Sequence, residues 1–294
     1  DFTNWMASAT TTADERRLLK GAKIVSAIRT KGEILIWTDA SLHGMQYTNR
    51  GDFAYALRTI GEQCGLLAPN AAAAQGDVAY WMGQRNFYLY DGRVRVLPSP
   101  LRKEVFDNLE TTQLDKIAAG TNSQHNEIWW FWQSTAGSEN DRFTIYNYGE
   151  RIWYHGNLER TAWADKTVWD YPMAMDSVGQ LRDHEFGYND DGNAMTTWVE
   201  TGDFDIADGD DIMLMGGIIP DFVQSGTVTL TLKARKYPNT EQISKGPYNV
   251  TASDDYIKAR IRGRQVAVRV GSAEVDAMWR MGVLRYDARP DGKN

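Results

Sequence analysis

The sequence predicts an all-β protein in which β-propeller blades precede an antiparallel β-sandwich-like domain. Three aromatic-rich strand pairs recur in the first part of the chain, where Trp37, Trp81 and Trp130 follow one another at intervals of 44 and 49 positions. Units of roughly 40 to 50 residues built of short strands and tight turns are typical of propeller blades. The chain also holds 11 Trp, 14 Tyr and 9 Phe, which favours strands over helices. We therefore expect the three tryptophans to occupy equivalent core positions in successive blades.

The blades are expected over residues 24–189, after an N-terminal connection over 1–23 that continues a missing upstream part. Within this connection, Thr12 and Glu15 have the spacing of a capping box, which predicts a short helix over 16–20. Further blades of a closed propeller would lie in the upstream part.

Blade strands are recognised as aromatic and β-branched runs bounded by turn residues. The expected strands cover 24–28, 34–37, 78–82, 87–90, 128–132 and 143–148. Turns are predicted by the segments Lys31-Gly32, Asp91-Gly92 and Tyr148-Gly149-Glu150. Two interruptions are either short helical turns or long connections, because periodicity does not distinguish the two. These interruptions are 53–65 and 101–119, and a fourth, shorter blade is expected over 173–187.

A second domain is expected over residues 190–294. The stretch from Tyr188 to Asn193 is polar turn material, so a domain boundary is placed near Asp190. Residues 227–235 alternate cleanly between apolar and polar, as a sheet with one solvated face requires. The expected strands of this domain are 196–201, 212–219, 227–235, 256–262 and 265–270.

The charge balance limits the classes of partner. A net charge of −7 and a pI near 5.2 provide no basic field to attract nucleic acid or an anionic membrane. No apolar run approaches the ~20 residues that span a bilayer, and no secretory signal is visible. The single cysteine, Cys64, is interpreted as a small buried hydrophobic residue.

A set of segments resembles one family along most of the chain. From about residue 34 to the end, these segments occur in a single order, and together they resemble the packaged-DNA stabilisation or nozzle proteins of short-tailed bacteriophages. The segments are Val78–Gly83, Phe87–Gly92, Leu97-Pro98, Val105-Phe106, Asn126–Trp130, Arg160–Trp163, Ile219–Phe222, Arg262–Gln265, Trp279–Gly282 and Arg289–Gly292. The chain departs from the family at its front, because members of that family are longer.

This resemblance implies a structural virion protein of the tail, assembled in the host cytoplasm. The family implies a β-propeller protein arranged as a homo-oligomeric ring, usually a hexamer, below the portal and its adaptor. Partners would be the portal adaptor, other tail proteins and tail fibres, with double-stranded DNA passing through the lumen without sequence-specific binding. The acidic balance is compatible with that role, since like charge prevents the counterion-release binding that would retain DNA.

Metal-ligand patterns are weak, and no cofactor is expected. In Asp183-His184-Glu185, neighbours on a strand would point to opposite faces and would not converge on one ion. An acidic loop clusters hard oxygen ligands but misses the EF-hand register, so a solvated turn is favoured and calcium in another geometry stays open. Its carboxylates are Asp203, Asp205, Asp208, Asp210 and Asp211.

Catalytic patterns are also missing, and we expect a protein that is not an enzyme. The sequence contains no Gly-x-Ser-x-Gly elbow, no Walker loop and no Cys-x-x-Cys. A carboxylate pair for glycoside hydrolysis is defined by a separation of about 5 to 9.5 Å in the fold, so the sequence leaves that alternative open. Trp129, Trp130 and Trp132 could stack on sugars, yet the run 128–132 is apolar on both faces and favours a buried strand.

A basic run near the end of the chain is the candidate assembly interface. Lys258, Arg260, Arg262 and Arg264 alternate with small or apolar residues and would share one face of a strand. That face is either solvated, or in contact with an acidic neighbouring subunit, or in contact with DNA. A ring of identical subunits pairs two different patches, and the acidic loop with Asp203, Asp205, Asp208 and Asp210 is the complementary patch.

Three functions of different classes follow. The first is a ring-forming tail-channel protein that retains packaged DNA and forms the conduit for genome ejection. The second is a host-surface module that binds glycans through exposed aromatic residues. The third is a propeller glycoside hydrolase.

Overall fold

The computed structural model describes residues 6–8, 13, 15–18, 20–50 and 53–293, and its strands form antiparallel sheets throughout. The all-β class expected from the sequence is confirmed. The chain divides into two compact units, Asp1–Phe186 and Gly187–Asn294, a few residues before the boundary expected near Asp190. No helix in the described part of the chain is long and apolar enough to cross a membrane.

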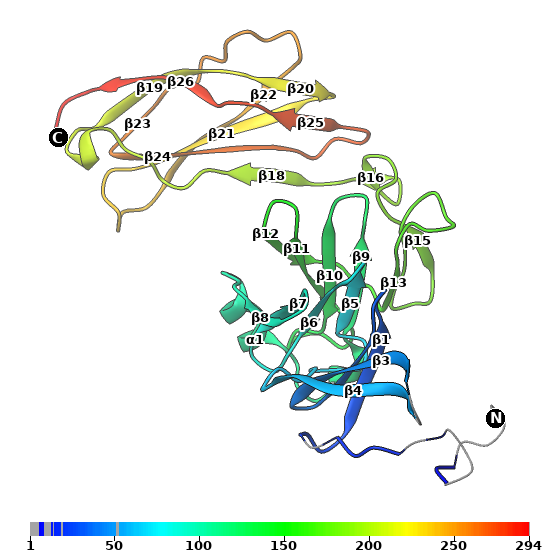
Figure 1. Ribbon diagram of the computed structural model, residues 1–294. Helices are drawn as coiled ribbons and strands as arrows, with labels where there is room; N and C mark the ends of the chain where they lie inside the picture. Colours follow the sequence, from blue (N-terminus) through cyan, green and yellow to red (C-terminus); the bar gives the residue numbers. More distant parts are fainter. Residues whose placement is uncertain (1–5, 9–12, 14, 19, 51–52, 294) are drawn as a thin grey trace. The chain divides into compact units, whose positions relative to one another are not determined.

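The first unit begins with three four-stranded sheets in series, each with its strands in chain order (Figure 1). The first sheet contains β1 (Ile24–Arg29), β2 (Ile34–Thr38), β3 (Ser41–Arg50) and β4 (Phe53–Glu62). The second contains β5 (Ala72–Gln75), β6 (Val78–Met82), β7 (Phe87–Tyr90) and β8 (Val94–Leu97). The third contains β9 (Ala118–Asn122), β10 (Glu127–Trp132), β11 (Arg142–Asn147) and β12 (Ile152–Asn157).

The predicted aromatic strand pairs are confirmed as β1 with β2, β6 with β7, and β10 with β11. The two interruptions that periodicity left open have different outcomes. Residues 53–65 contain strand β4, whereas 101–119 contain helix α1 (Arg102–Asn108) and the 3-10 turn η1 (Leu114–Lys116). Gly92 has φ of +102°, which explains why Asp91-Gly92 turns the chain between β7 and β8.

The core of the first unit joins successive sheets through aromatic rings. Trp37, Trp81 and Trp130 lie on the second strand of their respective sheets, and each is fully buried. The rings of Trp37 and Trp81 meet edge to face at 5.4 Å between centroids, and Phe87 packs on Trp130 at 4.9 Å. Two of the three buried indole nitrogens find acceptors on distant segments, since Trp81 donates to the Cys64 carbonyl and Trp130 to the Ala71 carbonyl, whereas Nε1 of Trp37 has no hydrogen-bond partner in the part of the chain that the structure describes.

A fourth sheet follows with three strands, β13 (Ala162–Ala164), β14 (Met173–Met175) and β15 (Leu181–Asp183). It begins before the expected start at Met173, and its first strand, Ala162-Trp163-Ala164, is too short to be recognised from the sequence pattern. The first strands of the four sheets form a series in which β1 contacts β5, β5 contacts β9, and β9 contacts β13. These four strands position the cavity described below.

The helix expected over 16–20 is wrong for the residues that the structure describes. Glu15 to Leu18 and Lys20 have no helical structure, and Thr12 lies outside the described residues. A single isolated turn does not repay the cost of helix nucleation, so a capping signal without tertiary packing is insufficient.

The second unit begins with a small hairpin, β16 (Asn189–Asp190) and β17 (Asn193–Ala194), whose turn residues Asp191 and Gly192 both have positive φ. One sheet has the order β18-β24-β21-β22, another β23-β19-β26, and a third pairs β20 with β25. Their bounds are β18 (Thr197–Glu200), β19 (Met213–Ile219), β20 (Phe222–Ser225), β21 (Val228–Arg235), β22 (Ile243–Val250), β23 (Ile261–Gly263), β24 (Gln265–Ser272), β25 (Met278–Met281) and β26 (Arg285–Pro290), with a 3-10 turn η2 (Ala207–Gly209).

Alternation along β21 is confirmed, since every second residue from Val228 to Ala234 is buried and the others are half-buried. The buried face shares one core with Met213, Met215 and Ile218 of β19 and with alternate valines of β24. The strand expected over 256–262 is largely wrong, because only Ile261–Gly263 pairs in a ladder, against β19.

Candidate functional site

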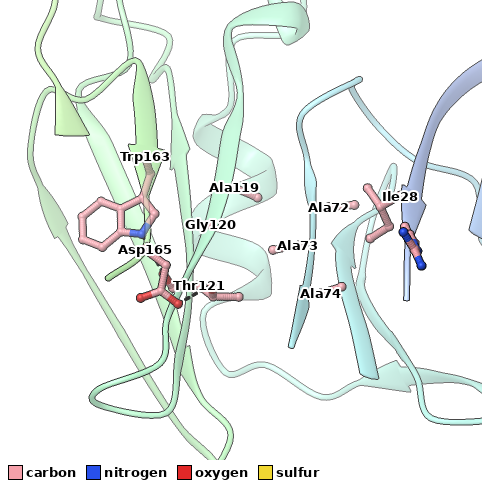
Figure 2. Close-up of a pocket in the computed structure, with 10 residues that line it drawn as sticks. Ile28, Ala72, Ala73, Ala74, Ala119, Gly120, Thr121, Trp163 and Asp165 are labelled. Atoms are coloured by element: carbon pink, nitrogen blue, oxygen red, sulfur yellow. Dashed lines mark hydrogen bonds between the residues drawn. The ribbon is translucent and has the colours of Figure 1, made fainter. Parts of the chain in front are cut away.

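A cavity of about 330 Å³ lies in the first unit, lined by residues of the first strand of each sheet. Figure 2 shows Ile28 and Ala72 to Ala74 on one side and Trp163 and Asp165 on the other, with Ala119, Gly120 and Thr121 between them. The lining residues are Ile28, Arg29, Ala72, Ala73, Ala74, Ala119, Gly120, Thr121, Trp163 and Asp165. Small side chains on β5 and β9 leave this space unfilled, so the cavity follows directly from the alanine and glycine content of these strands.

The acidic group at the cavity is held in place by β9 and the residue after it. The Asp165 carboxylate accepts hydrogen bonds from the Thr121 hydroxyl at 2.7 Å and from the Ser123 backbone and hydroxyl at 3.1 and 3.2 Å. Figure 2 shows the Thr121 contact. Asp165 therefore joins the segment after β13 to the end of β9, across 42 to 44 positions of sequence.

Trp163 also lines the cavity. Its indole nitrogen donates to the Thr121 carbonyl at 2.8 Å, and its ring stacks on Trp129 at 5.0 Å between centroids. Gly120 lies directly against the ring, so that any Cβ at this position would overlap Trp163. The Trp163 ring is therefore held in a fixed position between Gly120 and Trp129.

His184 packs edge-on against Trp163 at 4.9 Å and accepts a hydrogen bond from Nε of Arg160 at 2.8 Å. Burial and, to a smaller extent, the positive charge of Arg160 together lower the pKa of His184 to about 4. The imidazole is therefore neutral near pH 7 and serves as an acceptor for the guanidinium.

A carboxylate cluster lies at the turn between β9 and β10. The side-chain amide of Asn122 donates to Glu127 at 3.3 Å and to Glu185 at 3.1 Å, while Glu185 also faces His125 at 3.4 Å. Burial raises the pKa of Glu127, the nearby charge of Glu185 raises it too, and a hydrogen bond from Trp129 opposes this. A carboxyl group with a raised pKa beside a second carboxylate is an arrangement that can hold and release a proton.

Of Asp183-His184-Glu185, only Asp183 lies on a strand, β15, so strand alternation does not set the directions of the other two side chains. His184 lies against Trp163, while Glu185 reaches Asn122 and His125. In the described part of the chain, no group of three or more His, Cys, Asp or Glu is arranged to hold a metal ion. The acidic loop contains the turn η2, and its first carboxylate, Asp203, faces Arg235 at 3.6 Å.

The basic run keeps its predicted alternation, and two of its arginines have partners within the same chain. Lys258, Arg260 and Arg262 are exposed, whereas the residues between them are buried. Arg262 pairs with Asp291 at 2.6 Å, and Arg264 donates to the backbone carbonyls of Gly209 and Asp210. The basic run and the acidic loop therefore contact each other within one chain. The expectation of two separate complementary patches is corrected, because the bridge between Phe204 and Val266 brings both segments to the same edge.

The sequence run 128–132 does not form a sugar platform. Trp130 and Trp132 are buried in the main core of the first unit, and Trp129 packs against Phe131, Phe143 and Trp163. Residues that sequence reasoning did not single out for a site are Asn122, Glu127, Trp163 and Asp165. Each depends on partners more than 40 positions away, or on a tight turn, and none belongs to a short motif.

Comparison with known proteins gives limited results. No protein-family model matches the chain, and no curated protein matches it. Solved structures with some similarity include an exo-beta-1,3-galactanase from Phanerochaete chrysosporium crystallised with galactose, at 9% identity and a TM-score of 0.28, covering 83% of this chain and 77% of that one. Another, described as a glycoside hydrolase, has 11% identity and a TM-score of 0.26, covering 86% of this chain and 82% of that one.

These neighbours contradict the expectation that the chain is not an enzyme, because they are glycoside hydrolases, and that expectation is withdrawn. With such TM-scores and identities, the neighbours do not assign a fold family or an activity to this chain.

Proposed function

We propose that the chain is a structural component of a bacteriophage tail, in which it forms the ring-shaped nozzle below the portal and adaptor. In this proposal the first unit consists of β-propeller blades, and the second is a β-sandwich-like domain. Packaged DNA is retained by the assembled ring and leaves through its lumen, while the protein makes no sequence-specific contact with it.

The observation that carries the proposal is that the family-like segments contact one another in the fold. In the first unit, Trp163 of Arg160–Trp163 stacks on Trp129 of Asn126–Trp130. In the second unit, Ile219–Phe222 and Trp279–Gly282 are adjacent, because Phe222 pairs with Met281 and Gly282 donates to the Asp221 carbonyl at 2.7 Å. Segments this far apart in sequence that meet in space define a fold, so their joint resemblance to one family supports a shared architecture.

The serial sheets support the blade assignment. Each of the first three sheets has four antiparallel strands in chain order, and the first strands of four successive sheets line one cavity. Propeller blades are four-stranded sheets arranged around a central channel, with the first strand innermost. In the second unit, β21 and β24 of one sheet share a core with β19 of another, as the two layers of a sandwich do.

The charge of the chain fits passage of DNA. DNA binding is driven by counterions that Lys and Arg side chains displace from the phosphates, and a chain with a net charge of −7 displaces few of them. The glycan-binding alternative in its original form is not favoured, since the tryptophans of 128–132 are buried.

Two measurements test the proposal. We expect size-exclusion chromatography with light scattering to show a closed oligomer, and electron microscopy of the parent particle to show the chain as a ring in the tail. A purely monomeric chain that is missing from the particle's tail would contradict the proposal.

A charge-reversal pair tests the assembly surface. Lys258 and Arg260 are exposed, whereas Arg262 and Arg264 have partners within the chain. We expect Lys258→Glu with Arg260→Glu to weaken ring formation, and added salt to weaken the wild-type ring because exposed charges are screened. The matched control is Arg102→Glu with Lys103→Glu on helix α1, which also reverses two exposed charges. Equal assembly of both double variants would show that the basic run is only a solvated face.

A further inference from the structure

One tryptophan of the second unit is exposed in an ordered setting. Trp198 lies on β18 and is 56% exposed. Strand β18 is the edge strand beside β24 (Figure 1). Trp198 pairs with Gly271 across the ladder, and Gly271 in turn pairs with Thr229 of β21. The neighbouring row consists of Glu200, Arg269 and Thr231 in the same order. Both rows lie on the face of the sheet opposite the apolar core, because Val228, Leu230 and Leu232, which alternate with the threonines along β21, are buried.

Gly271 makes this face concave. It lies between Trp198 on one side and Thr229 on the other, and it contributes no side chain. A Cβ at this position would lie 2.9 Å from the Cβ of Trp198 and 2.5 Å from the Thr197 carbonyl oxygen. The result is a notch of about 140 Å³ that is lined by Trp198, Arg269, Gly271 and the hydroxyl-bearing residues Thr197, Thr229 and Thr231.

The side chains around the notch are held before any ligand arrives. The guanidinium of Arg269 lies 4.2 Å from the centre of the Trp198 ring and covers part of it. Glu200 faces Arg269 at 3.9 Å and forms a closer ion pair with Lys233 at 2.6 Å. The indole is therefore supported by a chain of charged contacts while more than half of the residue stays open to solvent. Such preorganisation reduces the entropy lost on binding.

From this arrangement we infer that the second unit carries a saccharide-binding site, in which the ring of a pyranose stacks on Trp198 and its hydroxyl groups bond to Thr231 and Arg269. Binding sites for small polar ligands combine an apolar wall with a few placed polar groups, which the notch provides. Arg269 and Lys233 outnumber Glu200, so the site accepts neutral sugars and sugars that carry a carboxylate.

A nucleobase is the competing ligand, since bases also stack on exposed tryptophan. The net charge of −7 disfavours a phosphate backbone, because binding to a polyanion requires a basic surface. A saccharide is therefore favoured over single-stranded nucleic acid.

Calorimetric titration of the whole chain tests the inference, with saturation-transfer NMR as a second readout. The probes are neutral gluco- and galacto-oligosaccharides in one arm and oligogalacturonates in the other, which distinguishes neutral from acidic sugars. A single-stranded oligonucleotide forms the third arm. We expect at least one saccharide arm to bind, and Trp198→Ala to weaken that binding about tenfold or more, which corresponds to the loss of ~1.4 kcal/mol.

Two further variants separate stacking from general damage. Trp198→Phe should retain part of the affinity because it keeps an aromatic face, and Gly271→Ala should weaken binding because the new methyl group displaces Trp198. The control is Trp169→Ala in the first unit, because Trp169 is also 56% exposed. Thermal unfolding of every variant shows whether the second unit remains folded.

The inference is overturned if both saccharide arms fail to bind the wild-type chain, or if only the oligonucleotide binds. It is also overturned if the Trp198→Ala variant binds the saccharide as the wild type does, whatever the result for Trp169→Ala. All residues that line the notch come from one chain, so a failure to bind saccharide would leave the ring proposal untouched, and the reverse also holds.

Discussion

The two units of this chain both consist of antiparallel sheets, but different kinds of side chain form their buried cores. The buried core of the first unit contains Trp37, Trp81, Trp130 and other aromatic rings that join one sheet to the next. The buried core of the second unit contains no aromatic residue among the described residues and depends on Val, Leu, Ile, Met and Ala. Aromatic rings therefore connect successive sheets in the first unit, whereas aliphatic side chains fill the buried core of the second unit.

The largest expected effect is in the aromatic core. Trp130→Ala should lower the free energy of unfolding by roughly 3–5 kcal/mol, because it opens a cavity and removes the hydrogen bond to the Ala71 carbonyl. Calorimetry should show the loss in the transition of the first unit. The control is Trp169→Ala, which is exposed and should shift that transition little. Equal shifts of the unfolding transition for Trp130→Ala and Trp169→Ala would contradict a stabilising role of the aromatic core in the first unit.

A truncation in the aliphatic core should destabilise the second unit. Leu230→Ala is expected to cost roughly 2–5 kcal/mol, because Leu230 is fully buried and its replacement leaves a cavity. The loss should appear in the transition of residues 187–294. Its neighbour Thr231 lies on the opposite face of β21, so Thr231→Ala should have a much smaller effect. A Leu230→Ala variant that instead melts the first unit would show that the two cores are not independent.

The third effect depends on pH and is confined to the first unit. The folded chain holds the pKa of His184 at about 4, below the ordinary value of 6.5, so the unfolded chain binds the proton more readily. His184 therefore contributes its full stabilisation above pH 6.5 and loses it as the pH falls towards 4, by at most about 3 kcal/mol.

Chemical unfolding at several pH values checks this, with His184→Gln as the comparison. The stability difference between wild type and variant should shrink as the pH falls. The raised pKa of Glu127 acts in the opposite direction but is present in both proteins, so it cancels in the difference. A difference that stays constant from pH 7 to pH 4 would contradict a buried neutral imidazole.

The smallest expected effect concerns the close packing of glycine against an aromatic ring. Gly120→Ala should cost roughly 1–3 kcal/mol, because its Cβ would overlap Trp163 and the ring is already stacked on Trp129. Gly32→Ala is the control, since no atom lies within 4 Å of a Cβ there. Thermal unfolding of both variants compares them directly, and equal midpoints would show that Trp163 can move aside.

The strands that the sequence did not predict share a physical cause. β5 reads Ala-Ala-Ala-Gln and β9 reads Ala-Ala-Gly-Thr-Asn, neither of which has strand propensity. They become strands because they pair with β6 and β10, whose aromatic residues are buried on both faces. β22 contains Pro247 and is largely exposed, as an edge strand can be, so it shows no alternation.

The candidate sites were harder to predict than the strands, because they depend on contacts between residues far apart in the sequence. The acidic loop and the basic run were each visible as charge patterns, but their contact through Arg264 and Asp210 spans 54 positions. The Trp198 notch requires β18 to pair with β24, and its floor is a glycine that has no motif around it.

The sequence by itself determined the all-β class, the central aromatic strand pairs, the burial of Trp37, Trp81 and Trp130, and the one-sided alternation of β21. These features are local, since hydrophobic period and turn residues act over a few positions. Only the tertiary structure decided which first strands border the cavity, which carboxylates meet Asn122, and which tryptophan stays open to solvent. Those outcomes depend on contacts between distant segments, whose geometry is set when whole sheets pack together and not by the residues on either side.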